Sequence, residues 1–414
     1  MHSQESQHIW SKNFIMILLG QIVSLFGNAI LRFALPLYLL EISGSAALFG
    51  TVLALSALPM IVLSPIGGIL ADRVNKKKIM VVLDFITAGV VTIYMLTMGV
   101  FSVIPATVVI MMALFGIQAI MTPAVDGSIP LLVAESQLVR ANSVVFLIHS
   151  LSGMLGPAIG GILFAAFGLP FILLISAIAF VLAAIMEIFI KVPNVKQEAA
   201  ENIVSLVVGD IKQGLQFIVR ERPLIGKITL VGFFLQLSLA AFITIGIPIL
   251  ITQTLSLGEH MLGYIQGLMG AGGVLGGILA GVLGAKLRMS KMHVLLFVTS
   301  ILFLPLMLAL LLGFPPYVVY AILAVTCLVV MCINTLLSIQ IFSFIQANSP
   351  EHLLGKVMSL FMMLILLGMP FGQFLFGMLF EWFAHIPWLV VLIAVVAAAI
   401  NALNAGRYLK DLEE

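Results

Sequence analysis

The amino-acid sequence predicts an all-α polytopic membrane protein in which twelve transmembrane helices form two six-helix halves. Three observations support this fold class. The 414-residue chain is 62% hydrophobic and 9% charged, whereas a soluble domain carries about 25% charged residues. Apolar runs long enough to cross the hydrocarbon core of a bilayer, about 18 residues or more, recur along the whole chain. The two halves also repeat each other in sequence.

The apolar runs define the candidate spans in order. They lie at residues 13–39, 47–71, 79–100, 104–124, 141–166, 170–190, 225–252, 261–285, 293–313, 317–341, 356–380 and 386–406. A long polar segment separates the sixth span from the seventh. We therefore expect an N-terminal six-helix half at 1–190, a cytoplasmic linker at 191–223 and a C-terminal six-helix half at 224–414.

Apolar residues recur at helical spacing within the linker, and polar residues lie on the opposite face. The apolar set is Val204, Val207, Ile211, Leu215 and Ile218, and the polar set is Asp210, Lys212, Gln213 and Gln216. This pattern favours an amphipathic helix on the membrane surface. The alternative is a solvated linker in which the apolar stripe is accidental.

The positions of Lys and Arg predict the orientation. If the N-terminus is cytoplasmic and twelve spans alternate, every Lys and Arg except Arg32 falls on the cytoplasmic side. The outer loops then carry Glu41, Glu259 and Glu381. Because cytoplasmic loops are enriched in basic residues, we expect a multi-pass protein of the cell inner or plasma membrane with both termini in the cytoplasm.

The internal repeat is clearest around the second span of each half. Residues 48–78 match residues 261–291 at one constant offset, which places Gly68 on Gly281. Parallel repeats of this kind occur in transporters that handle their substrate between the two halves. An enzyme or nucleotide hydrolase is disfavoured, because the sequence shows neither metal-ligand spacing nor a glycine-rich phosphate loop. We expect no metal, no cofactor and no nucleic-acid partner.

Several motifs resemble those of the major facilitator superfamily. GGILADRVNKKK resembles its cytoplasmic loop signature, at Gly68, Asp72, Arg73, Lys76, Lys77 and Lys78. Asn75 stands where that signature usually has glycine, and Asn tolerates the left-handed backbone conformation. GPAIGG matches the fifth-helix signature associated with drug–proton antiporters, at Gly156, Pro157, Gly160 and Gly161. The patterns PLLVAESQLVRANS and LLGKVMSLFMMLILLGMPFG are similar to the macrolide-efflux branch.

The resemblance implies a secondary active exporter that works by alternating access and exchanges protons for amphipathic drugs such as macrolides. Two alternatives share the fold: a flippase for lysophospholipids or other lipids, and a siderophore exporter. The implied partners are a small amphipathic organic substrate, protons and membrane lipids, and we expect a monomer.

The loop signature brings one carboxylate and several cations to a helix end on the cytoplasmic side. Asp72 and its basic neighbours form a candidate latch that opens when the halves move. The alternative is that the lysines only keep the loop in the cytoplasm.

Glycines define one face of the fifth span. Gly153, Gly156 and Gly160 share this face, and small residues let helices approach closely in lipid. We expect the face to slide on the matching glycines of the eighth span, Gly273, Gly277 and Gly281, with Pro157 adding a bend. Static packing is the alternative.

Polar residues within the spans mark a candidate transport path. A row on one face of the first span comprises Gln21, Ser24, Asn28 and Arg32. A lipid-facing row would be costly, so we expect it to line a central cavity, together with Gln118, Gln236 and Gln373. Arg32 is a candidate for receiving an anionic group of the substrate. Alternatively, it reaches the outer surface or pairs with Glu41 or Glu381.

A proton-coupled antiporter needs a carboxyl group that gains and loses a proton near neutral pH. The candidates are Asp84, Asp126 and Glu187. Asp84 is the first choice, because the resemblance also places an acid there. Its alternative role is a structural partner for the basic loop. His149 in the fifth span fits a hydrogen-bonding role better than a titrating one.

Overall fold

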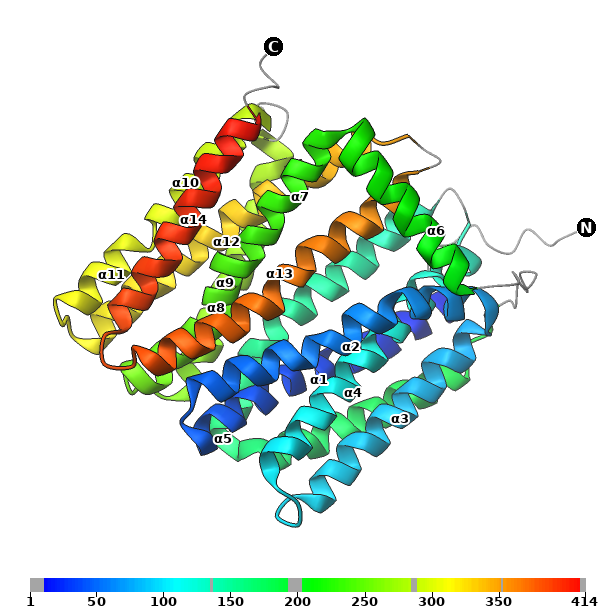
Figure 1. The fold of residues 1–414 in the computed structure, drawn as a ribbon. Helices are drawn as coiled ribbons and strands as arrows, with labels where there is room; N and C mark the ends of the chain where they lie inside the picture. The colour runs from blue at the N-terminus through cyan, green and yellow to red at the C-terminus, as the bar shows by residue number, and fades with distance from the viewer. Residues whose placement is uncertain (1–10, 135–136, 193–202, 284–288, 351–352, 410–414) are drawn as a thin grey trace, which may run out of the picture. The chain divides into compact units, whose positions relative to one another are not determined.

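The structure, a computed structural model, describes residues 11–134, 137–192, 203–283, 289–350 and 353–409 (Figure 1). These residues are almost entirely helical and contain no named strand. The first five helices are α1 (Lys12–Ser43), α2 (Ala46–Arg73), α3 (Lys76–Thr97), α4 (Val103–Asp126) and α5 (Leu138–Ile188). The next five are α6 (Ile203–Gln216), α7 (Pro223–Leu235), α8 (Ala241–Ile249), α9 (Glu259–Leu283) and α10 (Met292–Ile301). The last four are α11 (Leu304–Leu311), α12 (Pro316–Ala347), α13 (Leu354–Trp382) and α14 (Pro387–Leu409).

Short 3-10 and π-helical turns link some of these helices. The 3-10 turns are η1 (Ile129–Leu131) and η7 (Met289–Lys291), and the π turns are η3 (Phe217–Glu221), η4 (Gln236–Ala240) and η5 (Leu250–Thr254). The π turn η4 joins α7 to α8 and η5 follows α8, so that together they form one span, Pro223–Thr254. In the same way, η7, α10 and α11 form the span Met289–Leu311.

The helix α5 contains two of the predicted spans. In the described part of the chain, eleven helical segments are long and apolar enough to cross a membrane. The longest is interrupted at Gly168, whose φ of 73° and ψ of −179° are not helical. Essentially only glycine occupies this region, so Gly168 fixes the break between the spans expected at 141–166 and 170–190. Counting both parts of α5 gives twelve spans, and the predicted fold class is confirmed.

The chain divides into two compact units. One comprises Met1–Leu39 and Leu55–Ile203, and the other comprises Leu40–Ala54 and Val204–Glu414. One boundary therefore falls within the linker expected at 191–223. The units differ from the two sequence halves in one respect. The short segment Leu40–Ala54 lies in the N-terminal half of the sequence but groups with the second unit.

Contacts with α13 explain why the start of α2 belongs to the second unit. A Cβ added to Gly50 would lie 2.9 Å from the Cα of Gly377, so the two helices approach each other at glycines. Glu381 accepts hydrogen bonds from the Ser45 hydroxyl, at 3.1 Å, and from the backbone N–H of Ala47, at 3.2 Å. A carboxylate at the N-terminus of a helix is stabilised by the free N–H groups and the helix dipole.

In the first unit, α3 lies along α4 and α5 (Figure 1). Two groups of buried side chains hold the ends of its helices together. One contains Ile17, Met80 and Ile190, and the other contains Phe14 and Ile129. The N-terminal turns of α1 are thereby fixed against α3, α5 and η1.

In the second unit, α9 lies along α12 (Figure 1). A Cβ added to Gly272 or Gly276 would overlap the backbone carbonyl of Leu328 or Cys332, respectively. These two glycines therefore allow α9 and α12 to touch through their backbones. Gly277 and Gly281, which we expected on a sliding face, have no heavy atom within 4 Å of an added Cβ.

The linker helix α6 contacts α13. Lys356 of α13 donates a hydrogen bond to Oε1 of Gln213 at 2.7 Å. After α6, the side chains of Phe217 and Ile218 are buried in an apolar cluster with α7 and α13. The side chains of Val204, Val207 and Asp210 lie outside the described part of the chain. The position of this helix on a membrane surface stays a prediction.

We expect Gly168→Ala to lower the free energy of unfolding by about 1–3 kcal/mol, because alanine is strained at this φ and ψ. Gly89→Ala is the matched control. Gly89 lies inside α3, where an added Cβ meets no heavy atom within 4 Å and alanine favours the helix. Thermal unfolding in detergent should show a lower midpoint for Gly168→Ala only, and equal midpoints for the two variants would contradict the assignment.

Candidate functional site

The polar row of α1 faces the interior of the first unit, where it contacts two carboxyl groups. Gln21 donates a hydrogen bond through Nε2 to Oε1 of Glu187 on α5, at 3.4 Å. The hydroxyl of Ser24 donates to Oδ1 of Asp84 on α3, at 2.9 Å. All four side chains are buried. The α1 row therefore joins two of the three acids that the sequence singles out.

One oxygen of each carboxyl group remains without a hydrogen bond. Among the described residues, Oδ2 of Asp84 and Oε2 of Glu187 are buried and have no partner. An ionised carboxylate in such a place would lose its hydration without full compensation. The site therefore has unused capacity to bind a proton or a donor.

The next two turns of α1 contact α4. Asn28 donates through Nδ2 to Oε1 of Gln118 at 3.1 Å, and Gln118 donates through Nε2 to the Thr122 hydroxyl at 2.9 Å. The guanidinium carbon of Arg32 lies 3.6 Å from the ring centroid of Phe115, in cation–π contact. These residues form a polar and aromatic contact between α1 and α4.

Sequence reasoning missed Phe115 and Thr122. Their spacing offered a signal, because Phe115, Gln118 and Thr122 are three and four residues apart and so share one face of α4. The row on α1 has the same kind of spacing. Matching the two rows would have suggested that they face each other.

The remaining acid, Asp126, has different surroundings. It is exposed at the end of α4 and interacts electrostatically with His149 of α5. Its environment therefore differs from that of the two buried carboxyl groups.

The other cavity candidates belong to the second unit. Gln236 is half-buried and begins the π turn η4, and π turns within α-helices are frequent at functional sites. Gln373 of α13 is buried, and its Oε1 accepts no hydrogen bond from the described residues. Oε1 of Gln373 therefore retains hydrogen-bonding capacity inside the second unit.

The loop between α2 and α3 turns without a left-handed residue at Asn75. Its φ is −57°, and its side chain accepts a hydrogen bond from the backbone N–H of Lys78 at 3.2 Å. The left-handed conformation considered for Asn75 is therefore corrected: this residue caps the N-terminus of α3, a position that favours Asn.

The rest of the loop signature surrounds this cap. Gly68 lies in α2 with no heavy atom within 4 Å of an added Cβ. Arg73 ends α2 and is half-buried, as are Lys76 and Lys77 at the start of α3. The side chain of Asp72 lies outside the described part of the chain. The latch therefore stays a prediction.

The fifth-span glycines make close contacts with α1. A Cβ on Gly156 would overlap the Cβ of Ala29, and a Cβ on Gly160 would lie 3.4 Å from the Cα of Ile30. An added Cβ on Gly153 meets no heavy atom within 4 Å. Two of the three glycines expected on a sliding face thus pack on a helix of their own unit.

The rest of the motif keeps the helical path. Gly161 is buried. The backbone at Pro157 has helical dihedral angles, and the interruption of α5 is at Gly168 instead.

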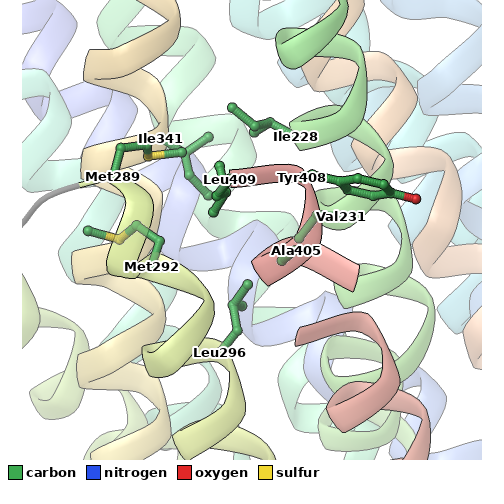
Figure 2. A pocket seen from close by; sticks show the side chains of 9 residues that line it. All are labelled: Ile228, Val231, Met289, Met292, Leu296, Ile341, Ala405, Tyr408 and Leu409. Atoms are coloured by element: carbon green, nitrogen blue, oxygen red, sulfur yellow. The ribbon is translucent and has the colours of Figure 1, made fainter. Parts of the chain in front are cut away.

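An apolar pocket lies between helices of the second unit. Figure 2 shows its nine lining residues, which come from α7, η7, α10, α12 and α14. They include Met289, Met292 and Tyr408, whose hydroxyl oxygen points away from the other side chains (Figure 2). A binding site usually combines apolar walls with a few convergent polar groups. This pocket has no such convergence, so it is a weaker substrate candidate than the α1 row.

Comparison with known proteins decides the family. A family model described as Major Facilitator Superfamily matches residues 17–373. The chain belongs to the Major Facilitator Superfamily. It is therefore a multi-pass membrane protein and a transporter, as the motifs in its loop and fifth span suggested.

Two relatives of this Major Facilitator Superfamily chain are exporters. Macrolide efflux protein A from Streptococcus pyogenes is 27% identical over 424 residues, covering 97% of this chain and 98% of the relative. The enterobactin exporter EntS of Shigella boydii serotype 4 (strain Sb227) is 24% identical over 371 residues, covering 88% of this chain and 84% of the exporter. The resemblance to the macrolide-efflux branch is confirmed.

A solved structure shows the same fold. The crystal structure of D-xylose-proton symporter matches with a TM-score of 0.72 and 15% identity, covering 95% of this chain and 97% of the symporter. At this identity the likeness supports the Major Facilitator Superfamily fold alone.

We expect Gly156→Ala to impair this Major Facilitator Superfamily protein and Gly153→Ala to leave it intact. The first substitution forces α5 away from α1, and overpacking of this kind costs about 1–3 kcal/mol. The second substitution finds open space in the same motif. Unfolding temperature and transport rate, measured on both variants, test this contrast. Equal effects of the two substitutions would show that the contact at Ala29 is unimportant.

Proposed function

We propose that the protein is a secondary active exporter that exchanges protons for amphipathic organic molecules such as macrolides. The observation that carries this proposal is the buried carboxyl group of Asp84, held by Ser24 of α1 inside a transporter whose relatives include exporters. A buried carboxyl group is stable when protonated and costly to ionise, and it can lose and regain a proton during each transport cycle.

The chain's own residues supply the steps of this exchange. Asp84 gains a proton from one side of the membrane and releases it to the other, and Ser24 donates a hydrogen bond to its ionised form. Asn28 offers an amide group one turn further along the same row, and Gln118 of α4 accepts a hydrogen bond from it. Substrate that binds near this row would compete with the proton for these hydrogen bonds, which is the coupling that antiport requires.

The proposed setting is the cell inner or plasma membrane, with both termini in the cytoplasm. The basic residues support this orientation, because the positive-inside rule places them on the cytoplasmic side. The chain would work as a monomer among membrane lipids, with α6 on the cytoplasmic side.

Arg32 favours a second candidate, export of amphipathic molecules that carry an anionic group. The partner of its guanidinium group among the described residues is the ring of Phe115 rather than a carboxylate. Siderophores and lysophospholipids are substrates of this kind, and one relative is described as an enterobactin exporter. A guanidinium group binds carboxylate or phosphate oxygens through paired hydrogen bonds.

We expect Asp84→Asn to abolish substrate-dependent proton movement, because the amide carries no exchangeable acid proton. The measurement uses purified protein in liposomes with a pH dye trapped inside and macrolides added outside. Coupled proton flux should fall by about tenfold or more, equivalent to about 1.4 kcal/mol or more. Glu259→Gln is the control, since Glu259 lies at the start of α9 in the second unit. Unchanged pH dependence in Asp84→Asn would remove Asp84 from the coupling step.

We expect Arg32→Gln to weaken the binding of anionic amphiphiles by about tenfold or more, because a hydrogen bond to a charged group contributes about 1.5–3 kcal/mol. Binding of uncharged or cationic compounds should change little. Arg32→Lys keeps the charge but loses the planar fork, so an intermediate effect is expected. The measurement is the affinity of detergent-purified wild-type protein, Arg32→Gln and Arg32→Lys for each of these compounds. If Arg32→Gln binds every compound as tightly as the wild-type protein, Arg32 does not contact the substrate.

A further inference from the structure

The α1 row binds two carboxyl groups, and the proton coupling proposed above uses only that of Asp84. Glu187 is buried in the same way and has no role in that scheme. The exposed fraction is 1% for Asp84 and 0% for Glu187. Each carboxyl group accepts one hydrogen bond from α1 through one oxygen and leaves the other oxygen without a partner among the described residues. The two sites are therefore built in the same way, on two different helices.

The two carboxyl groups are held by neighbouring donors on one face of α1. Their donors, Gln21 and Ser24, are three residues apart on one face of α1, which corresponds to a rise of about 4.5 Å. Asp84 and Glu187 interact electrostatically with each other. In addition, a Cβ added to Gly20 would lie 3.3 Å from Cγ of Glu187, so α1 and α5 are in close contact beside the pair.

Neither carboxyl group forms an ion pair with a described residue. The basic residue that follows Ser24 on α1 is Arg32, which is about 12 Å from Ser24 along the helix axis and rests on Phe115. Lys78 and Lys191, the basic residues nearest to the two acids in sequence, are exposed. Two ionised carboxylates that are held by neighbouring donors, buried and without an ion-pair partner, would repel each other in addition to losing their hydration. A single proton shared by the pair removes one of the two charges.

We propose that Asp84 and Glu187 act as one proton-binding site, in which the two carboxyl groups hold a single exchangeable proton. The oxygens available for it are Oδ2 of Asp84 and Oε2 of Glu187. Gln21 and Ser24 are positioning residues that hold the other oxygens. This inference rests on the proposed proton coupling and assigns the coupling proton to the pair rather than to Asp84 alone.

The pair connects the proton to the position of α1. Both donors belong to α1, whereas the acceptors belong to α3 and to the second part of α5. Any shift of α1 against these helices changes both hydrogen bonds at once, and with them the preference of the pair for its proton. Substrate that contacts Asn28 or Arg32 on the same helix acts on the pair through this shift.

The test counts protons per transported molecule in proteoliposomes that contain the full chain. The wild-type protein should move one proton per macrolide molecule. Asp84→Asn and Glu187→Gln should each reduce this ratio to zero, and the double variant should equal the single ones because both remove the same site. Glu259→Gln is the control for exchanging an acid for an amide, and unfolding temperatures identify variants that fail to fold.

Substitutions of the positioning residues keep both acids and provide a second measurement. Gln21→Leu and Ser24→Ala remove one donor each, and a donor to an ionised carboxylate favours the ionised form. Each variant should keep the ratio of one proton and move the pH profile of transport towards higher pH. A purely structural role would lower the rate at every pH without moving the profile.

The outcomes separate this inference from the function on which it rests. If the wild-type protein moves protons and Glu187→Gln retains the full ratio, the shared site is wrong and Asp84 alone can remain the coupling acid. If single variants each lose half of a two-proton ratio, the acids are independent and the shared site is also wrong. If the wild-type protein moves no protons with any substrate, proton coupling itself fails, and the shared site fails with it.

Discussion

No water is present in the hydrocarbon core of a membrane to satisfy backbone N–H and C=O groups, and this constraint shapes the whole chain. It requires that the spans be helical, and it makes every polar side chain within them costly unless another side chain binds it. The chain meets the second requirement in part. The row on α1 has partners on α3, α4 and α5, so one helix gathers much of the polar chemistry of the first unit. Oδ1 of Asn28 and one oxygen of each partner carboxyl group have no hydrogen bond among the described residues.

The same constraint explains the glycines. Lipid tails are as apolar as leucine, so helices gain little by hiding apolar surface from them, and close contact of backbones becomes the main source of attraction. Gly156 against Ala29, Gly276 against Cys332 and Gly50 against Gly377 are three instances in different parts of the fold. Dispersion and polar contacts both improve where such helices touch, because the distance between the helix axes is short.

Much of the fold follows from the sequence, because the thickness of a bilayer fixes the length of an apolar run. The twelve spans, the break near Gly168 and the grouping of Gln21, Ser24, Asn28 and Arg32 on one face all come from periodicity and length. Periodicity and length do not predict which side chains bind to that row. Whether Ser24 meets Asp84, or Gln21 meets Glu187, depends on how helices distant in sequence rotate against each other, and single-sequence spacing carries no information on that rotation. The sequence could not predict that Leu40–Ala54 belongs to the second unit for the same reason, because Gly50 contacts Gly377, which lies far along the chain.

The helix α2 belongs to both units, with Ala46–Ala54 in the second and the remainder in the first. A continuous helix resists bending, because each turn is closed by backbone hydrogen bonds. Rotation of one unit against the other would therefore place torque on α2 unless the helix has a soft point. Pro59 lies a few residues past the boundary at Ala54, and proline removes one N–H from the hydrogen-bond ladder. In the alternating-access cycle that we propose, the stiffness of this single helix would set part of the free-energy barrier between the two conformations.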